Sequence, residues 1–237
     1  KGSHLPFGRD VNYPVLTPTA TTSGANILSR RPNPAFGAVL VLDSDQSASY
    51  DGLQLTTTYR LSRILSLNAF YTLSKTLSSV QLQNNTTQGL AQNYSKLYED
   101  KGRADTDQRH VFTASFNFQP NFYKGSSRIA GAFLNGWSLS PIIKMRSGRP
   151  FSVTNGNVDA NLDGNTNDRA QLIGDPHISN PTPQQWFNTA AFARNLVVTG
   201  IATDGSSPRN LLTGPSYTAV DLALSRDFSF GERVKLR

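Results

Sequence analysis

Period-two alternation of apolar and polar side chains recurs along this chain. The segments that show it are residues 50–61, 64–74, 109–119, 137–146 and 219–230. In the first, Leu53 and Leu55 share one face, and Gln54 and Thr56 share the other. Each segment is about as long as the 9–11 residues of a tilted membrane strand. The pattern predicts β-strands with one apolar face, and a further strand is expected to begin at 233–237.

One residue breaks the pattern. Arg226 falls on the apolar row of the 219–230 segment, near its end. We expect its guanidinium to reach toward a membrane interface there, since long basic side chains keep their charge in water and their stem in the apolar layer.

The connections alternate between short and long. Tight turns are predicted at 61–64 and 230–233, and a moderate link with glycines at 119–137. The long, polar loops cover about 6–49, 75–108 and 147–218. Outer-membrane barrels have short periplasmic turns and long extracellular loops, whereas a soluble sandwich has no reason to place its long loops at one end. We therefore predict an all-β, antiparallel up-and-down meander of the outer-membrane barrel type.

The size of the chain sets a limit on closure. At the observed strand spacing, 237 residues hold about three hairpins, while the smallest closed membrane barrels have about 8 strands. An open sheet leaves edges that lipid cannot satisfy. The expectation is a partial barrel.

Composition narrows the classes of function. An aromatic content of 10% disfavours disorder, and the absence of cysteine excludes disulfides and thiolate metal sites. The net charge of +7 raises nucleic acid or anionic lipid as partners, but Lys and Arg are scattered, with no run longer than Arg30-Arg31. No nucleic-acid partner is expected.

The sequence resembles the C-terminal barrel region of TonB-dependent outer-membrane transporters of the Oar-like kind, common in acidobacteria. The matching phrases, in the family's order, include 49-SYDGLQLTTTYRLSRILSLNAFYTLSK-75, 103-RADTDQRHVFTASF-116, 136-GWSLSPIIKMRSGRPFSV-153 and 208-PRNLLTGPSYTAVDLALSRDFSFGERVKLR-237. The resemblance spans nearly the whole chain.

That resemblance implies a location in the bacterial outer membrane and uptake or export of a bulky ligand. It implies that a regulatory-like domain, a plug and further strands precede this region and that closing strands follow it, so the chain is expected to be a fragment. Outer-membrane lipid and the rest of the barrel would be its partners, and TonB would act only through the missing N-terminal part. No ligand-binding residue can be carried over.

The stretch 157-NVDANLDGNTNDRA-170 resembles a calcium loop. Oxygen ligands at alternate positions and a glycine at the sixth suit calcium, but position twelve is Ala170 instead of a bidentate Glu. The candidate calcium ligands are Asp159, Asn161, Asp163, Asn165, Asn167 and Asp168. The alternative is a surface loop in which Asp, Asn and Gly satisfy turn geometry without an ion. No other cofactor is expected.

No catalytic residue is predicted, and we expect no enzyme activity. The three histidines, His4, His110 and His177, have neither HExxH nor i, i+4 spacing. The cluster of Asp105, Asp107, Arg109 and His110 could imitate an acid–base site, but we interpret it as an ion-pair network at a loop–strand junction.

Two further interpretations stay open. A short loop helix is predicted at 183–194, with Thr182 as N-cap and Pro183 at the first helical position; its aromatic residues would pack in the loop body.

The alternative for the whole chain is a secreted or surface-assembled β-protein that closes its sheet by oligomerising, with calcium stabilising it.

Overall fold

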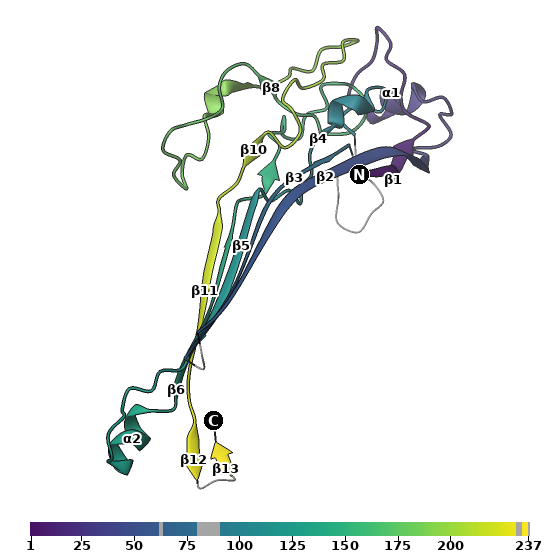
Figure 1. Cartoon of the computed structure of the whole chain (residues 1–237). Helices are drawn as coiled ribbons and strands as arrows, with labels where there is room; N and C mark the ends of the chain where they lie inside the picture. The colour runs from purple at the N-terminus through teal and green to yellow at the C-terminus, as the bar shows by residue number, and fades with distance from the viewer. Residues whose placement is uncertain (62–63, 80–90, 231–233, 237) are drawn as a thin grey trace. The chain divides into compact units, whose positions relative to one another are not determined.

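The computed structural model describes residues 1–61, 64–79, 91–230 and 234–236 (Figure 1). Its main feature is a seven-stranded sheet in the order β1-β2-β3-β5-β6-β11, with β4 paired to β3. The strands of this sheet are β1 (Gly2–Asp10), β2 (Leu40–Leu61), β3 (Leu65–Ser78), β4 (Gly102–Arg103), β5 (His110–Phe118), β6 (Trp137–Arg146) and β11 (Tyr217–Arg226). The predicted fold class, an open antiparallel sheet of the barrel type, is confirmed.

Contacts divide the chain into two compact units. Unit 1 contains residues 1–51, 75–107 and 149–214, and unit 2 contains residues 52–74, 108–148 and 215–237. Unit 1 thus holds most of the long connections, and unit 2 holds the predicted membrane strands. None of the helices among the described residues is long and apolar enough to cross a membrane.

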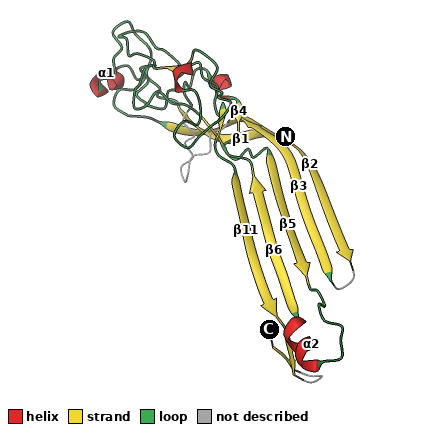
Figure 2. Ribbon diagram, turned by 90° about the vertical axis from the view of Figure 1, so that its left-hand side faces the viewer, coloured by secondary structure: helices red, strands yellow, loops and turns green. Residues whose placement is uncertain are grey.

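The strands of unit 2 lie side by side, as Figure 2 shows for β3, β5, β6 and β11. Their register pairs Leu65 with Phe118, Phe118 with Leu139 and Leu139 with Leu224, so these residues line one apolar face. The predicted alternation is therefore correct. β12 (Phe228–Phe230) and β13 (Val234–Leu236) form a further antiparallel pair, which confirms the strand expected at 233–237.

The apolar face of unit 2 is exposed. Leu222 and Leu224 are 67% and 64% accessible, and Leu53 is 54% accessible. Among the described residues, Ala114 is the one buried hydrophobic side chain that lies in unit 2. An apolar face that the chain does not cover is expected where lipid covers it, and not in a soluble sandwich.

Register also tests the predicted loop asymmetry. Leu73 pairs with His110, Val111 with Arg146 and Arg146 with Tyr217, so the loops after β3 and β6 leave from one end of the strands. The pair of Trp137 and Arg226 marks the other end, from which the 119–137 link leaves. The tight turns predicted at 61–64 and 230–233 include residues outside the described ranges. The two long loops and the shorter 119–137 link therefore lie at opposite ends, as predicted.

Unit 1 shows where the predicted loop boundaries need correction. The loop expected at about 6–49 overlaps the end of β1 and contains the first part of β2; the two strands pair from Gly2↔Ala48 to Asp10↔Leu40. The sequence 40-LVLDSDQSAS-49 does not alternate, so its strand is imposed by pairing with β1. Short strand pairs also form inside the last loop: β7 (Pro150–Phe151) with β10 (Leu212–Thr213), and β8 (Gln171–Leu172) with β9 (Phe192–Ala193).

The helix predicted at 183–194 is wrong. That stretch contains only the 3-10 turn η2 (Thr189–Ala191) before β9. Trp186 donates its indole N–H to the Thr213 carbonyl (2.7 Å) and Phe192 joins the ladder opposite Leu172, so contacts distant in sequence override the local capping signal. The expected aromatic packing does occur, with the Phe187 ring centroid 5.9 Å from that of Phe151. Helices form elsewhere, at α1 (Gly24–Ser29), η1 (Leu97–Asp100) and α2 (Arg128–Leu134).

Candidate functional site

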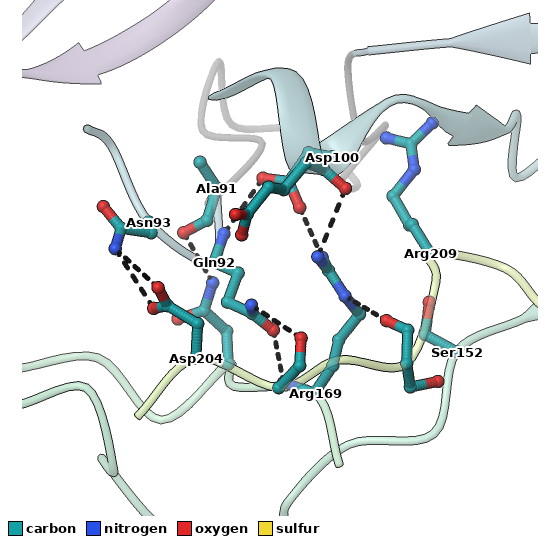
Figure 3. Close-up of polar contacts among 12 residues, drawn as sticks. Ala91, Gln92, Asn93, Asp100, Ser152, Arg169, Asp204 and Arg209 are labelled. Atoms are coloured by element: carbon teal, nitrogen blue, oxygen red, sulfur yellow. Dashed lines mark hydrogen bonds and ion pairs between the residues drawn. The ribbon is translucent and has the colours of Figure 1, made fainter. Parts of the chain in front are cut away.

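The long connections of unit 1 are held together by buried polar side chains. Arg169 and Asp100, both 6% exposed, form an ion pair. Arg169 also donates through Nε to the Ser207 carbonyl (2.8 Å), while its backbone N–H donates to the Gln92 side chain (2.8 Å; Figure 3). Gln92 donates in turn to the Gly205 carbonyl (3.1 Å). Because each bond joins segments far apart in sequence, this network fixes the loops relative to one another.

A second set of polar contacts lies beside it. The Asn93 amide donates to both carboxylate oxygens of Asp204 (3.1 Å), and Lys96 Nζ lies 2.6 Å from the same carboxylate (Figure 3 shows Asn93 and Asp204). The hydrogen bond to Asp204 raises the pKa of Lys96. The Lys96 side chain is 44% exposed, so its charge is also available to a ligand.

These residues border a cleft of about 420 Å³. Its polar lining is Tyr13, Arg30, Asn93, Ser95, Lys96, Asn161 and Asp204. The volume lies within the range of about 300–1,000 Å³ typical of small-molecule sites. Donors and acceptors converge on it, so it suits a ligand rich in hydrogen-bonding groups.

An aromatic cluster supports the Tyr13 wall of the cleft. Tyr13 and Tyr94 meet edge to face with ring centroids 5.5 Å apart, and Tyr94 packs against the buried Phe7. Burial raises the pKa of Tyr94 to about 12 and raises that of Tyr13 further. Both phenols are therefore neutral hydrogen-bonding groups at neutral pH.

The Asp-rich loop forms the adjoining wall. Asp159 accepts hydrogen bonds from the backbone N–H groups of Asp163 (3.0 Å) and Gly164 (2.9 Å), and Asp163 accepts one from that of Asn165 (2.6 Å). Gly164 has φ +90°, a conformation that glycine adopts without strain. These contacts are the turn-forming bonds that the sequence offered as the alternative to an ion.

The acidic groups of this loop have perturbed pKa values. Burial, with the charges of Asp159 and Asp168, raises the pKa of Asp163 to about 7. Burial likewise raises the pKa of Asp168 to about 6 and raises that of Asp159. Asp168 is fully buried, and its Oδ2 accepts from Ala160 N–H (2.7 Å). Among the residues that the structure describes, its Oδ1 has no hydrogen-bond partner.

The six predicted calcium ligands do not all converge. Asn161 donates to Asp163 (3.2 Å), but Asn167 donates to the Ala91 carbonyl (2.9 Å). Within the described ranges, no three or more His, Asp or Glu side chains are grouped so that they could hold a metal. Calcium binding by this loop stays a prediction.

The Asp105–His110 cluster divides into structural contacts. The fully buried Asp107 accepts from Arg103 Nε (2.9 Å) and from Thr76 N–H (2.7 Å), and Asp105 accepts from Asn210 (2.6 Å). The His110 ring lies 2.8 Å from the Tyr71 hydroxyl. An ion pair therefore forms, as interpreted, but its cation is Arg103 and not Arg109. The exposed His177 hydrogen-bonds to Asp175 within a turn (2.8 Å).

The comparisons with known proteins agree with the sheet. Residues 1–237 match the profile of a family described as "Outer membrane beta barrel domain". The chain belongs to this outer-membrane β-barrel family. Membership of this family points to the bacterial outer membrane. Neither the curated proteins nor the solved structures contain a match to the chain.

Several residues of the cleft and of the buried network beside it were not found from the sequence. Gln92, Asp204 and Arg30 carry no motif, and they come from different parts of the chain. The doublet Arg30-Arg31 was noted only for its charge, yet Arg30 is 8% exposed and donates to the Leu162 carbonyl (2.6 Å). The one usable signal was the nearby Asp-rich loop, whose carbonyls and carboxylates offer acceptors to a buried guanidinium.

Proposed function

We propose that this chain is part of a TonB-dependent outer-membrane transporter or receptor that moves a bulky ligand across the membrane. The observation that carries the proposal is the cleft in unit 1, built by a fixed network of long loops in an outer-membrane barrel protein. Long barrel loops are extracellular, so a cleft within them meets ligands from outside.

The residues of the cleft would divide the work of binding. Arg30, Asn93 and Lys96 supply donors, and Asn161 and Asp204 supply acceptors. The apolar strands of unit 2 would form the lipid-contacting wall. TonB would engage an N-terminal part of the parent protein, outside this chain. The ligand would be either taken up or exported.

The decisive test is TonB engagement in intact cells. The parent protein should cross-link to TonB with formaldehyde, because energised transporters contact TonB directly. A porin from the same cells serves as the control and should not cross-link. Absence of a cross-link, while a known TonB-dependent receptor in the same cells gives one, would contradict the proposal.

A second candidate is an assembly that closes its sheet with other copies of the chain. Its support is that β1 and β11 are the edges of the described sheet, and unpaired edges are templates for pairing. In that case the particle would be secreted or bound to the cell surface.

Calcium binding is a separate proposal. Its support is the set of mutually repelling carboxylates at Asp159, Asp163 and Asp168, which a divalent cation would stabilise. Affinity would be weak, about 10⁻⁴–10⁻³ M. Calcium should slow amide exchange across residues 155–170, and Asp163→Asn should abolish the effect; equal slowing by magnesium would indicate unspecific screening.

A further inference from the structure

The apolar face of unit 2 is hollowed at its short-turn end. A groove of about 450 Å³ has its floor on three neighbouring strands: Phe118 of β5, Trp137 and Leu139 of β6, and Leu224 of β11. Phe118 pairs with Leu139, and Leu139 with Leu224, so this floor continues the exposed apolar row of the sheet. The groove therefore opens on the exposed apolar face of unit 2.

The second wall comes from the connector between β5 and β6. Pro120, Phe122 and Leu134 complete the lining, which is apolar throughout. Figure 2 shows this connector and α2 beyond the ends of these strands. Phe122 is 66% exposed. An exposed apolar hollow of this kind marks a binding surface.

The connector is held in place by hydrogen bonds. Asn135 accepts from Tyr123 N–H and donates to the Tyr123 carbonyl, both at 2.9 Å. The Trp137 indole N–H donates to the Phe133 carbonyl (3.1 Å), which ties α2 to the start of β6. The wall is thus a fixed part of the fold, and an occupant would meet a formed groove.

A positive charge lies at the rim. Arg226 stands opposite Trp137 in the register, and its guanidinium carbon is 5.3 Å from the Trp137 ring centroid and 4.4 Å from that of Phe228. One guanidinium nitrogen donates to the Ala132 carbonyl, so the charge is anchored to the connector. Asp227 follows it in the chain, and Lys124 is exposed in the connector. In the structure the Arg226 guanidinium therefore makes cation–π contacts, and its reach toward a membrane interface stays a prediction.

An apolar groove with a fixed cation at its end matches the two parts of a phospholipid. We propose that the groove binds one acyl chain of an anionic glycerophospholipid from the periplasmic leaflet, with Arg226 facing its phosphate. Short barrel turns are periplasmic, which selects the leaflet. A basic group at such a rim attracts anionic head groups. The proposal rests on membership of the barrel family and is independent of TonB.

Trp137 is a built-in reporter. The chain has two tryptophans, so Trp186→Phe leaves Trp137 alone. Fluorescence of this variant would be measured in vesicles containing brominated phosphatidylglycerol or brominated phosphatidylcholine. We expect Trp137 to be quenched by both, with about fivefold tighter binding of phosphatidylglycerol. Arg226→Gln should remove the preference, and Phe122→Ala should weaken quenching by both lipids.

Ile129→Ala is the matched control, since Ile129 is 74% exposed on α2 but does not line the groove. Circular dichroism would verify that each variant folds; if Arg226→Gln does not, the Phe122→Ala and lipid comparisons still decide. Equal quenching by the two lipids, unchanged by Phe122→Ala, would contradict the proposal, because it would show that Trp137 meets only the surrounding bilayer and that the groove binds no particular lipid. Shielding of Trp137 from both lipids would show that protein occupies the groove instead.

Discussion

At the residue scale, the buried carboxyls of the Asp-rich loop make its stability depend on pH. The pKa values of Asp163 and Asp168 rise from 3.8 in the unfolded chain to about 7 and about 6. The folded loop therefore binds more protons than the unfolded loop between these values. Its stabilisation is complete below about pH 4 and is lost as the pH rises through 6 and 7.

Hydrogen exchange across residues 155–170 at pH 5 and pH 7.5, corrected for intrinsic rates, would measure this effect. We expect protection at least about tenfold lower at pH 7.5, since one pKa unit corresponds to a factor of ten. Asp163→Asn should flatten the dependence. A loop that gains protection as the pH rises would contradict the assigned direction.

The Arg169–Asp100 ion pair allows a second test at this scale. Arg169→Ala leaves Asp100 buried without its cation, and breaking such a pair costs about 3–5 kcal/mol. The control is Arg9→Ala, because the Arg9–Asp43 pair is 3.7 Å long with both side chains more than 40% exposed, and is expected to contribute about 0–1 kcal/mol. Limited proteolysis of unit 1 would compare the two; equal protection would show that the pair does not hold the loops.

The sequence anticipated some of these residues and not others. The turn-forming role of Asp159 and Gly164 follows from their types and spacing. The partners of Arg169 could not be predicted, because Asp100 and Ser207 lie 69 and 38 residues away. A hydrogen bond between two loops that are far apart in the chain produces no periodic pattern in the sequence of either loop.

At the element scale, the two faces of β11 should differ in their tolerance of charge. Leu222→Arg places a guanidinium on the exposed apolar face, at a cost of about 2–4 kcal/mol if the position lies near the middle of the bilayer. Ala223→Arg lies on the opposite face, paired with Ser140, and should cost much less. Urea unfolding in vesicles would measure both, and equal costs would place lipid on neither face.

The alternation of apolar and polar residues predicted the membrane strands because the two faces of each strand meet different environments, one apolar and one polar. It failed where both sides of a strand meet other protein or water. Leu40, Val41 and Leu42 are consecutive apolar residues of β2 and are all at least 40% exposed, and their strand depends on pairing with β1. The helix expected at 183–194 failed for a related reason, because Phe192 gained a ladder partner that local signals do not reveal.

At the scale of the whole molecule, the exposed face of unit 2 predicts dependence on detergent. The purified 237-residue chain should give β-sheet circular dichroism and a single small particle by light scattering only with micelles or liposomes. Without them it should aggregate, because contiguous apolar surface associates in water. A uniform β-rich particle in plain buffer would instead support the assembly from several copies, and its mass would give the number of chains.

The hydrogen-bonded core of unit 1 has a consequence for how related chains diverge. An apolar core tolerates exchange among side chains of similar volume. Here Gln92 forms hydrogen bonds with three other segments, through Asp100, Arg169 and Gly205. Replacing one residue of this network would leave buried polar groups of the others without their hydrogen-bond partner. Among relatives these positions should change together or not at all, while Leu222 and Leu224 drift among apolar types. The loops of unit 1 would then diverge by exchange of whole loops, with single substitutions confined to the rim of the cleft.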